Sequence, residues 1–161
     1  MLRLVFGLPI AILSAVYGPA NATEASTHHF RQVHAAATSI GVPVHYVTGR
    51  TGECSNERLL GVYVFAERAV YLCEANSNSD ARLFKTFKHE LWHAAQHVCR
   101  NMASTLTDDQ IRDALPHADR ATLRELYPEH QHRAEAEARV VAQLPTPDFL
   151  RGFNNVCRHL Q

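Results

Sequence analysis

Three residues near the middle of the chain, His89, Glu90 and His93, have the types and spacing needed to activate water on a metal ion. Residues four apart share one face of a helix, so the two imidazoles could hold one Zn²⁺ while Glu90 points toward the position left for water. Zinc lowers the pKa of such a water to about 7, and Glu90 could then take its proton as a general base. This HExxH pattern therefore predicts zinc-dependent hydrolysis.

Catalytic zinc usually has three protein ligands, so one more is expected. A segment read as helical, 129–144, offers Glu135 and Glu137. Glu137 shares its face with an apolar stripe that should meet the central helix, where a carboxylate is costly unless it is paired or metal-bound. Glu135 lies on a polar face, four residues before Arg139, as in an ordinary surface ion pair. We therefore predict Glu137 as the third ligand, with Glu135 as the alternative.

The elements expected around this centre define an α+β domain. Apolar residues surround the HExxH pattern in a helix expected at 80–100. A helix at 26–40 and a strand at 42–48 precede it, and the runs 59–65 and 69–73 are typical of a hairpin. Helices are expected afterwards at 108–115, 119–126, 129–144 and 147–160, the last capped by Thr146. We predict a small antiparallel sheet packed on the central helix, with 69–73 as an edge that could bind an extended peptide.

Residues 1–22 have the pattern of a secretory signal peptide. A positive start is followed by a short apolar run, and Ala20 and Ala22 are the small residues of a cleavage site. We expect cleavage after Ala22, leaving residues 23–161 as a single domain that is secreted or periplasmic, with no stable membrane insertion.

The four cysteines all lie beyond this predicted signal, and an even number in an exported protein favours two disulfides. We prefer the pairs Cys54–Cys73 and Cys99–Cys157 among the three possible connectivities. The first closes a short loop, and the second would tie the last helix to the central one.

Composition narrows the classes of partner. The 161 residues contain 16 Lys and Arg and 16 Asp and Glu, a formal net charge of zero. A neutral chain lacks the broad positive field that binds phosphate backbones, so nucleic acid is not expected as a partner. Histidine is abundant, with 11 copies, and this favours metal chemistry but also accidental pattern matches.

The segment HELWHAAQ followed by a helix containing ExEA resembles the gluzincin group of zinc metallopeptidases. The resemblance covers about 59–144 and implies zinc ligands at His89, His93 and Glu137, with Glu90 as the catalytic residue. The longer gap to the glutamate helix, and the lack of an ExxxD pattern there, indicate a small, divergent member. The HExxHxxGxxH pattern of metzincins is absent, because Gln96 and Cys99 occupy the positions of its glycine and third histidine.

Other candidate groups have simpler interpretations. His97 lies one turn beyond His93 and is expected to pack or to support a ligand, since three imidazoles spaced by four residues cannot reach one small ion. His130 and His132 are interpreted as solvated residues near a helix start, and Tyr127 is an alternative electrophile.

We expect a metallopeptidase that uses Zn²⁺ to cleave a peptide or protein substrate. One alternative is a secreted zinc-binding protein without catalysis, such as an inhibitor or adaptor. A second is a zinc amidase that acts on peptidoglycan peptides.

Overall fold

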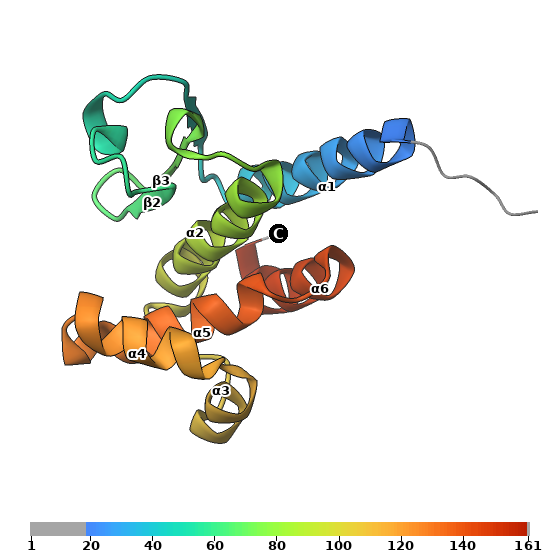
Figure 1. The fold of residues 1–161 in the computed structure, drawn as a ribbon. Helices are drawn as coiled ribbons and strands as arrows, with labels where there is room; N and C mark the ends of the chain where they lie inside the picture. Colours follow the sequence, from blue (N-terminus) through green and yellow to red (C-terminus); the bar gives the residue numbers. More distant parts are fainter. Residues whose placement is uncertain (1–18, 161) are drawn as a thin grey trace, which may run out of the picture.

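The computed structural model describes residues 19–160 and shows an α+β chain that is mostly helical (Figure 1). Its first helix, α1 (Pro19–Ser39), ends where Gly41 adopts a positive φ of 70°, a backbone conformation that glycine adopts without steric cost. The predicted signal segment lies outside the described residues up to position 18, and the expected cleavage point falls in the first turns of α1.

The sheet has three strands, β1 (Val44–Val47), β2 (Gly61–Val64) and β3 (Ala69–Cys73), in the order β1-β3-β2. β2 and β3 form the predicted antiparallel hairpin, with Tyr63 opposite Val70. β1 pairs with β3 in parallel, so the expectation of an all-antiparallel sheet was wrong. The short hairpin turn fixes the direction of β2 against β3, whereas the long connection 48–60 leaves the direction of β1 free.

This strand order also corrects the predicted sheet edge. β3 is the central strand, so Ala69–Cys73 cannot accept an added strand. The edge that packs on the central helix belongs to β2.

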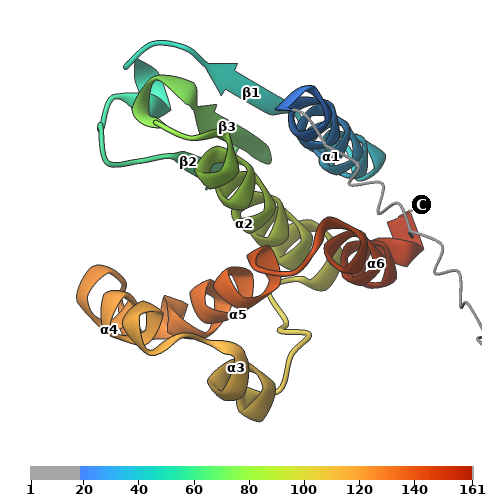
Figure 2. The ribbon, with the colours of Figure 1, turned by 45° about the vertical axis from the view of Figure 1, so that its right-hand side comes forward.

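The central helix, α2 (Asp80–Arg100), has the predicted bounds and lies between the sheet and the C-terminal helices (Figure 2). The helices that follow are α3 (Asp108–Ala114), α4 (His117–Leu126), α5 (His132–Ala142) and α6 (Thr146–Cys157). α5 and α6 both pack on α2, and α4 packs on α5. The predicted cap of α6 shifts by one residue, because Thr146 is already helical and Pro145 precedes it.

Burial of α2 on several sides explains its position. Phe87, Leu91 and Trp92 are almost fully buried, together with Ala94 and Ala95, as the apolar pattern predicts. Burying a side chain such as Phe87 or Leu91 contributes about 1.5–3 kcal/mol. The candidate functional residues of α2 therefore lie on an element that is firmly held in the core.

Both predicted disulfides are present, Cys54–Cys73 and Cys99–Cys157. The second joins the end of α2 to the end of α6. Among the described residues, no helix combines the length and the apolar character needed to cross a membrane.

The two disulfides are expected to differ in their effect on stability, because their loops span 58 residues for Cys99–Cys157 and 19 for Cys54–Cys73. Replacing Cys99 and Cys157 together by Ala should lower the free energy of unfolding by about 4 kcal/mol, and the other pair by about 3 kcal/mol. Urea unfolding followed by circular dichroism measures both values. An unchanged midpoint for either double variant would contradict this expectation.

Candidate metal centre

The two histidines of the HExxH pattern face each other on α2. The Nε2 atoms of His89 and His93 lie 3.1 Å apart, and their rings are nearly perpendicular. The predicted one-turn spacing therefore brings both imidazoles to one point. Both side chains are largely shielded from solvent, with 17% and 8% of their surface exposed.

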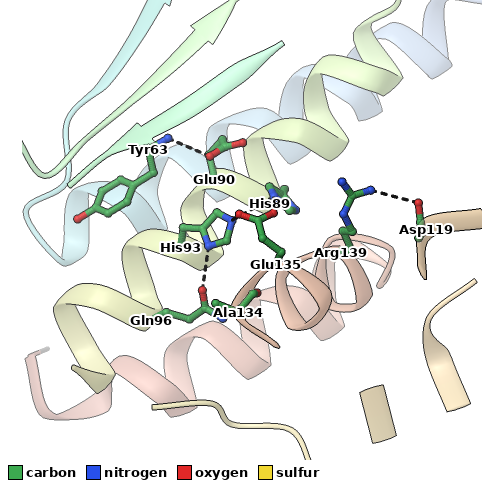
Figure 3. Close-up of polar contacts among 9 residues, drawn as sticks. All are labelled: Tyr63, His89, Glu90, His93, Gln96, Asp119, Ala134, Glu135 and Arg139. Carbon is green, nitrogen blue, oxygen red and sulfur yellow. Dashed lines mark hydrogen bonds and ion pairs between the residues drawn. The ribbon is translucent and has the colours of Figure 1, made fainter. Parts of the chain in front are cut away.

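The third group at this point is the carboxylate of Glu135 on α5 (Figure 3). Its Oε1 lies 3.2 Å from Nε2 of His93, and its Oε2 lies 3.3 Å from Nε2 of His89. For metal–ligand bonds of 2.0–2.1 Å, the ligand atoms of a tetrahedral site are about 3.3 Å apart. Glu135 meets each histidine through a different oxygen; with one donor atom from each side chain, the three atoms lie within 4.8 Å of one another, so the group could hold one metal ion.

Glu137, the ligand predicted from the sequence, is not at this point. It is fully buried on the core side of α5, as expected, but its carboxylate is occupied by the chain segment that follows α2. Oε1 accepts hydrogen bonds from the backbone N–H of Thr105 (2.7 Å), its hydroxyl (2.5 Å) and the N–H of Leu106 (3.0 Å). The prediction that a buried carboxylate needs a partner was sound, but the partner is backbone and hydroxyl rather than a metal.

The polar face assigned to Glu135 was also misread. Arg139 pairs with Asp119 of α4 at 3.2 Å instead of with Glu135. Only 13% of the Glu135 side chain is exposed, because α4, α5 and α2 together enclose this face. Helical periodicity predicted the apolar and the polar face of α5, but it did not predict that other helices cover both faces.

Gln96 connects Glu137 to the centre and determines which ring nitrogen of His93 carries the proton. Its amide nitrogen donates to Glu137 Oε2 at 2.9 Å and to the carbonyl of Ala134 at 3.2 Å. Both partners are acceptors, so the amide oxygen must be the atom that lies 2.9 Å from Nδ1 of His93. Nδ1 must therefore carry a proton, and in the neutral form of the ring Nε2 keeps the lone pair that a metal requires.

Charge at the centre favours a cation. Burial alone would raise the pKa of Glu135, but its contacts with His89 and His93 hold that pKa well below its ordinary value. Burial alone would lower the pKa of His93, but Glu135 and the nearby Glu90 raise it. In addition, Oε2 of Glu135 is buried and receives no hydrogen bond from the described part of the chain. A buried anionic oxygen without a donor is costly, and a metal ion would satisfy it.

Glu90 is held beside the centre by the sheet. Its Oε2 accepts a hydrogen bond from the backbone N–H of Tyr63 at 2.9 Å, which joins α2 to the edge strand β2. The side chain lines a pocket of about 470 Å³ together with His89. The walls of this pocket come from the start of β2, from α2, and from the α4–α5 region.

The remaining candidates lie outside the centre. His97 bonds through Nδ1 to the hydroxyl of Tyr63 at 2.9 Å, a packing role. His132 contacts the carbonyl of Tyr127 at 2.7 Å, and His130 is exposed. Tyr127 itself lines the pocket, and burial followed by the charge of Glu135 raises its pKa, so its phenol stays protonated at neutral pH.

Comparisons with protein-family models, curated proteins and solved structures gave no match to this chain.

Replacing Glu135 and Glu137 by Gln, one at a time, should distinguish their roles. Glu135→Gln removes a charged ligand and is expected to weaken zinc binding more than about 100-fold, whereas Glu137→Gln should weaken it about 10-fold through Gln96 and His93. Competition titration with a chromogenic chelator measures the affinity, and exposed Glu129→Gln serves as the control. A larger loss from Glu137→Gln than from Glu135→Gln would return Glu137 to the ligand set.

Gly61 allows β2 to approach α2 closely enough for the bond between Tyr63 and Glu90. A Cβ atom at Gly61 would lie 2.8 Å from Cγ2 of Thr86 and 3.0 Å from the carbonyl oxygen of Tyr71. Gly61→Ala should therefore lower the free energy of unfolding by about 1–3 kcal/mol. Thr86→Ser removes the nearer atom and should recover part of that loss in a double-mutant cycle measured by urea unfolding. Full stability of Gly61→Ala would show that the strand is not held this tightly.

Proposed function

We propose that this protein is a gluzincin-like zinc metallopeptidase that hydrolyses peptide bonds. The observation that supports this most directly is the convergence of His89, His93 and Glu135 beside Glu90 at the side of a pocket. Two imidazoles and one carboxylate are a typical protein ligand set of catalytic zinc, which keeps one position open for water or substrate.

The residues fit zinc by spacing, charge and protonation. The two Nε2 atoms lie 3.1 Å apart and each lies 3.2–3.3 Å from an oxygen of Glu135, which also has a buried oxygen without a hydrogen bond. The bond between Gln96 and His93 presets the tautomer that exposes a lone pair. Bound zinc would supply Lewis acidity, which lowers the pKa of a bound water to about 7 and polarises a carbonyl.

Glu90 supplies the proton transfers. Its hydrogen bond from Tyr63 occupies Oε2 and leaves Oε1 as the acceptor for the proton of an attacking water. The same carboxyl group then delivers that proton to the leaving amine. The bond from a sheet backbone holds the carboxylate in place through a neutral donor.

The edge of β2 offers a binding surface for an extended peptide next to these groups. The N–H of Tyr63 points to α2 rather than to β3, and the two-residue period of a strand directs the backbone groups of Gly61 to the same side. Gly61 lines the pocket. A substrate strand could bond to this edge and place its carbonyl at the centre.

The two disulfides support export, since such bonds form in oxidising compartments. We therefore keep the proposal of a signal peptide ending at Ala22 and a secreted or periplasmic site of action.

Glu90→Gln tests the proposed role of Glu90. We expect zinc content and affinity to stay near those of the unmodified protein, while cleavage of casein or of a quenched peptide library falls about 1,000-fold, because the proton acceptor is lost. Glu125→Gln, on the exposed face of α4, is the matched control and should keep full activity.

The outcome also separates the alternatives. Cleavage at full rate by Glu90→Gln would reject this assignment. A zinc-loaded protein that cleaves no peptide or amide bond would instead indicate a binding protein.

A further inference from the structure

We propose that the pocket selects substrates that carry a carboxylate next to the bond to be cleaved. This inference rests on the proposed peptidase function and names the substrate class of the same site. The pocket that contains His89 and Glu90 is lined by four cationic side chains, Arg58, Arg82, Lys85 and Arg139.

The charges of the pocket do not balance. Its lining contains two carboxylates, Asp119 and Glu90, against the four cations. Asp119 is already paired with Arg139 at 3.2 Å, and Glu90 is reserved for proton transfer. Because the whole chain has equal numbers of acidic and basic residues, this excess is a property of the pocket rather than of the composition.

Two of the cations have no partner of their own. Neither Arg58 nor Lys85 makes a side-chain hydrogen bond or ion pair within residues 19–160, so both are available to a ligand. Arg139 is only partly compensated, since its Nε is buried without a hydrogen-bond partner among those residues. Figure 3 shows Arg139 one turn after Glu135 on α5, with its ion pair to Asp119.

The loop that carries Arg58 is fixed to the fold. The Cys54–Cys73 disulfide ties it to β3, and Nδ2 of Asn76 donates to the carbonyls of Asn56 and Leu59 at 2.9 Å each. The N–H of Arg58 donates to Oδ1 of Asn56 at 3.0 Å. The backbone of this residue therefore has a defined position at the rim.

Arg82 is restrained in a similar way, by a bond from its Nη1 to Oδ1 of Asn78 at 3.2 Å. The cations of the pocket thus come from three elements, the loop before β2, the first half of α2, and α5. A peptide can present a carboxylate to them either on an Asp or Glu side chain or at its C-terminus. A pocket of about 470 Å³ is large enough for such a group and the adjoining residue.

The first test uses the zinc-loaded protein and quenched peptides that differ only by Glu or Gln at one position beside the cleaved bond, each with a free or an amidated C-terminus. We expect kcat/KM to be about 10-fold higher for a carboxylate than for its amide, mainly through KM, and the preference to fall as salt rises. The Glu pair and the C-terminal pair identify which carboxylate is read. Equal rates within both pairs would overturn the proposal.

Charge reversal locates the effect. Lys85→Glu and Arg58→Glu should each reduce the carboxylate preference about fivefold or more. Arg31→Glu, on the exposed face of α1, changes the net charge equally and should leave the preference intact. An equal loss in all three variants would show a general charge effect and contradict recognition in the pocket.

A binding measurement keeps this proposal separate from the peptidase proposal. Isothermal titration calorimetry of the same peptides with zinc-loaded Glu90→Gln requires no turnover. Suppose that the unmodified zinc-loaded protein cleaves no peptide, but that Glu90→Gln binds the carboxylate peptides about 10-fold more tightly than their amide counterparts. The peptidase assignment then fails and the selectivity holds. Equal or undetectable binding of the Glu and Gln peptides would overturn the selectivity.

Discussion

The structure depends on one close approach, that of the Glu135 carboxylate to the imidazoles of His89 and His93. The two Nε2 atoms lie 3.1 Å apart, each lies 3.2–3.3 Å from a different oxygen of Glu135, and this group, largely closed to water, could hold a cation. Each donor comes from a helix, α2 or α5, that packs in the interior, so moving it away from the centre would disrupt that packing. The packing of α5 on α2 is therefore as much a part of the site as the ligands are.

A buried polar network maintains this packing. Glu137 accepts hydrogen bonds from the N–H groups of Thr105 and Leu106, and Gln96 connects Glu137 to His93. Further along α2, the ammonium group of Lys88 donates to the carbonyl of Leu144 at 2.6 Å, which joins α2 to the turn after α5. A second glutamate thus acts through Gln96 on the position and the protonation of His93 without joining the candidate metal centre.

The sequence predicted those parts of the molecule that are determined locally. The bounds of α2 followed from its periodicity and the polar residues before it, and both disulfides followed from cysteine positions. The structure places Glu135, not the predicted Glu137, beside the two histidines, and this arrangement depends on which segments cover each face of α5. Thr105 and Leu106, the partners of Glu137, lie in an irregular segment without a pattern.

Other missed features have similar causes. The parallel pairing of β1 depends on a long connection, whose path the local sequence does not encode. No role was predicted for Gln96, although its place in the sequence could have indicated one. It is a polar residue three positions after His93, on a helix otherwise buried in apolar contacts, and such a residue needs a specific partner.

His89 and His93 lie on α2 and Glu135 lies on α5, far apart in the sequence, and this separation affects how the site forms during folding. Until α5 docks on α2, the chain offers only a pair of histidines, and the third donor arrives from residue 135 once the intervening segments have folded. Any metal binding at this group would then be thermodynamically linked to folding, since an unfolded chain has no preformed site. A nascent or misfolded copy would lack the complete group of three side chains.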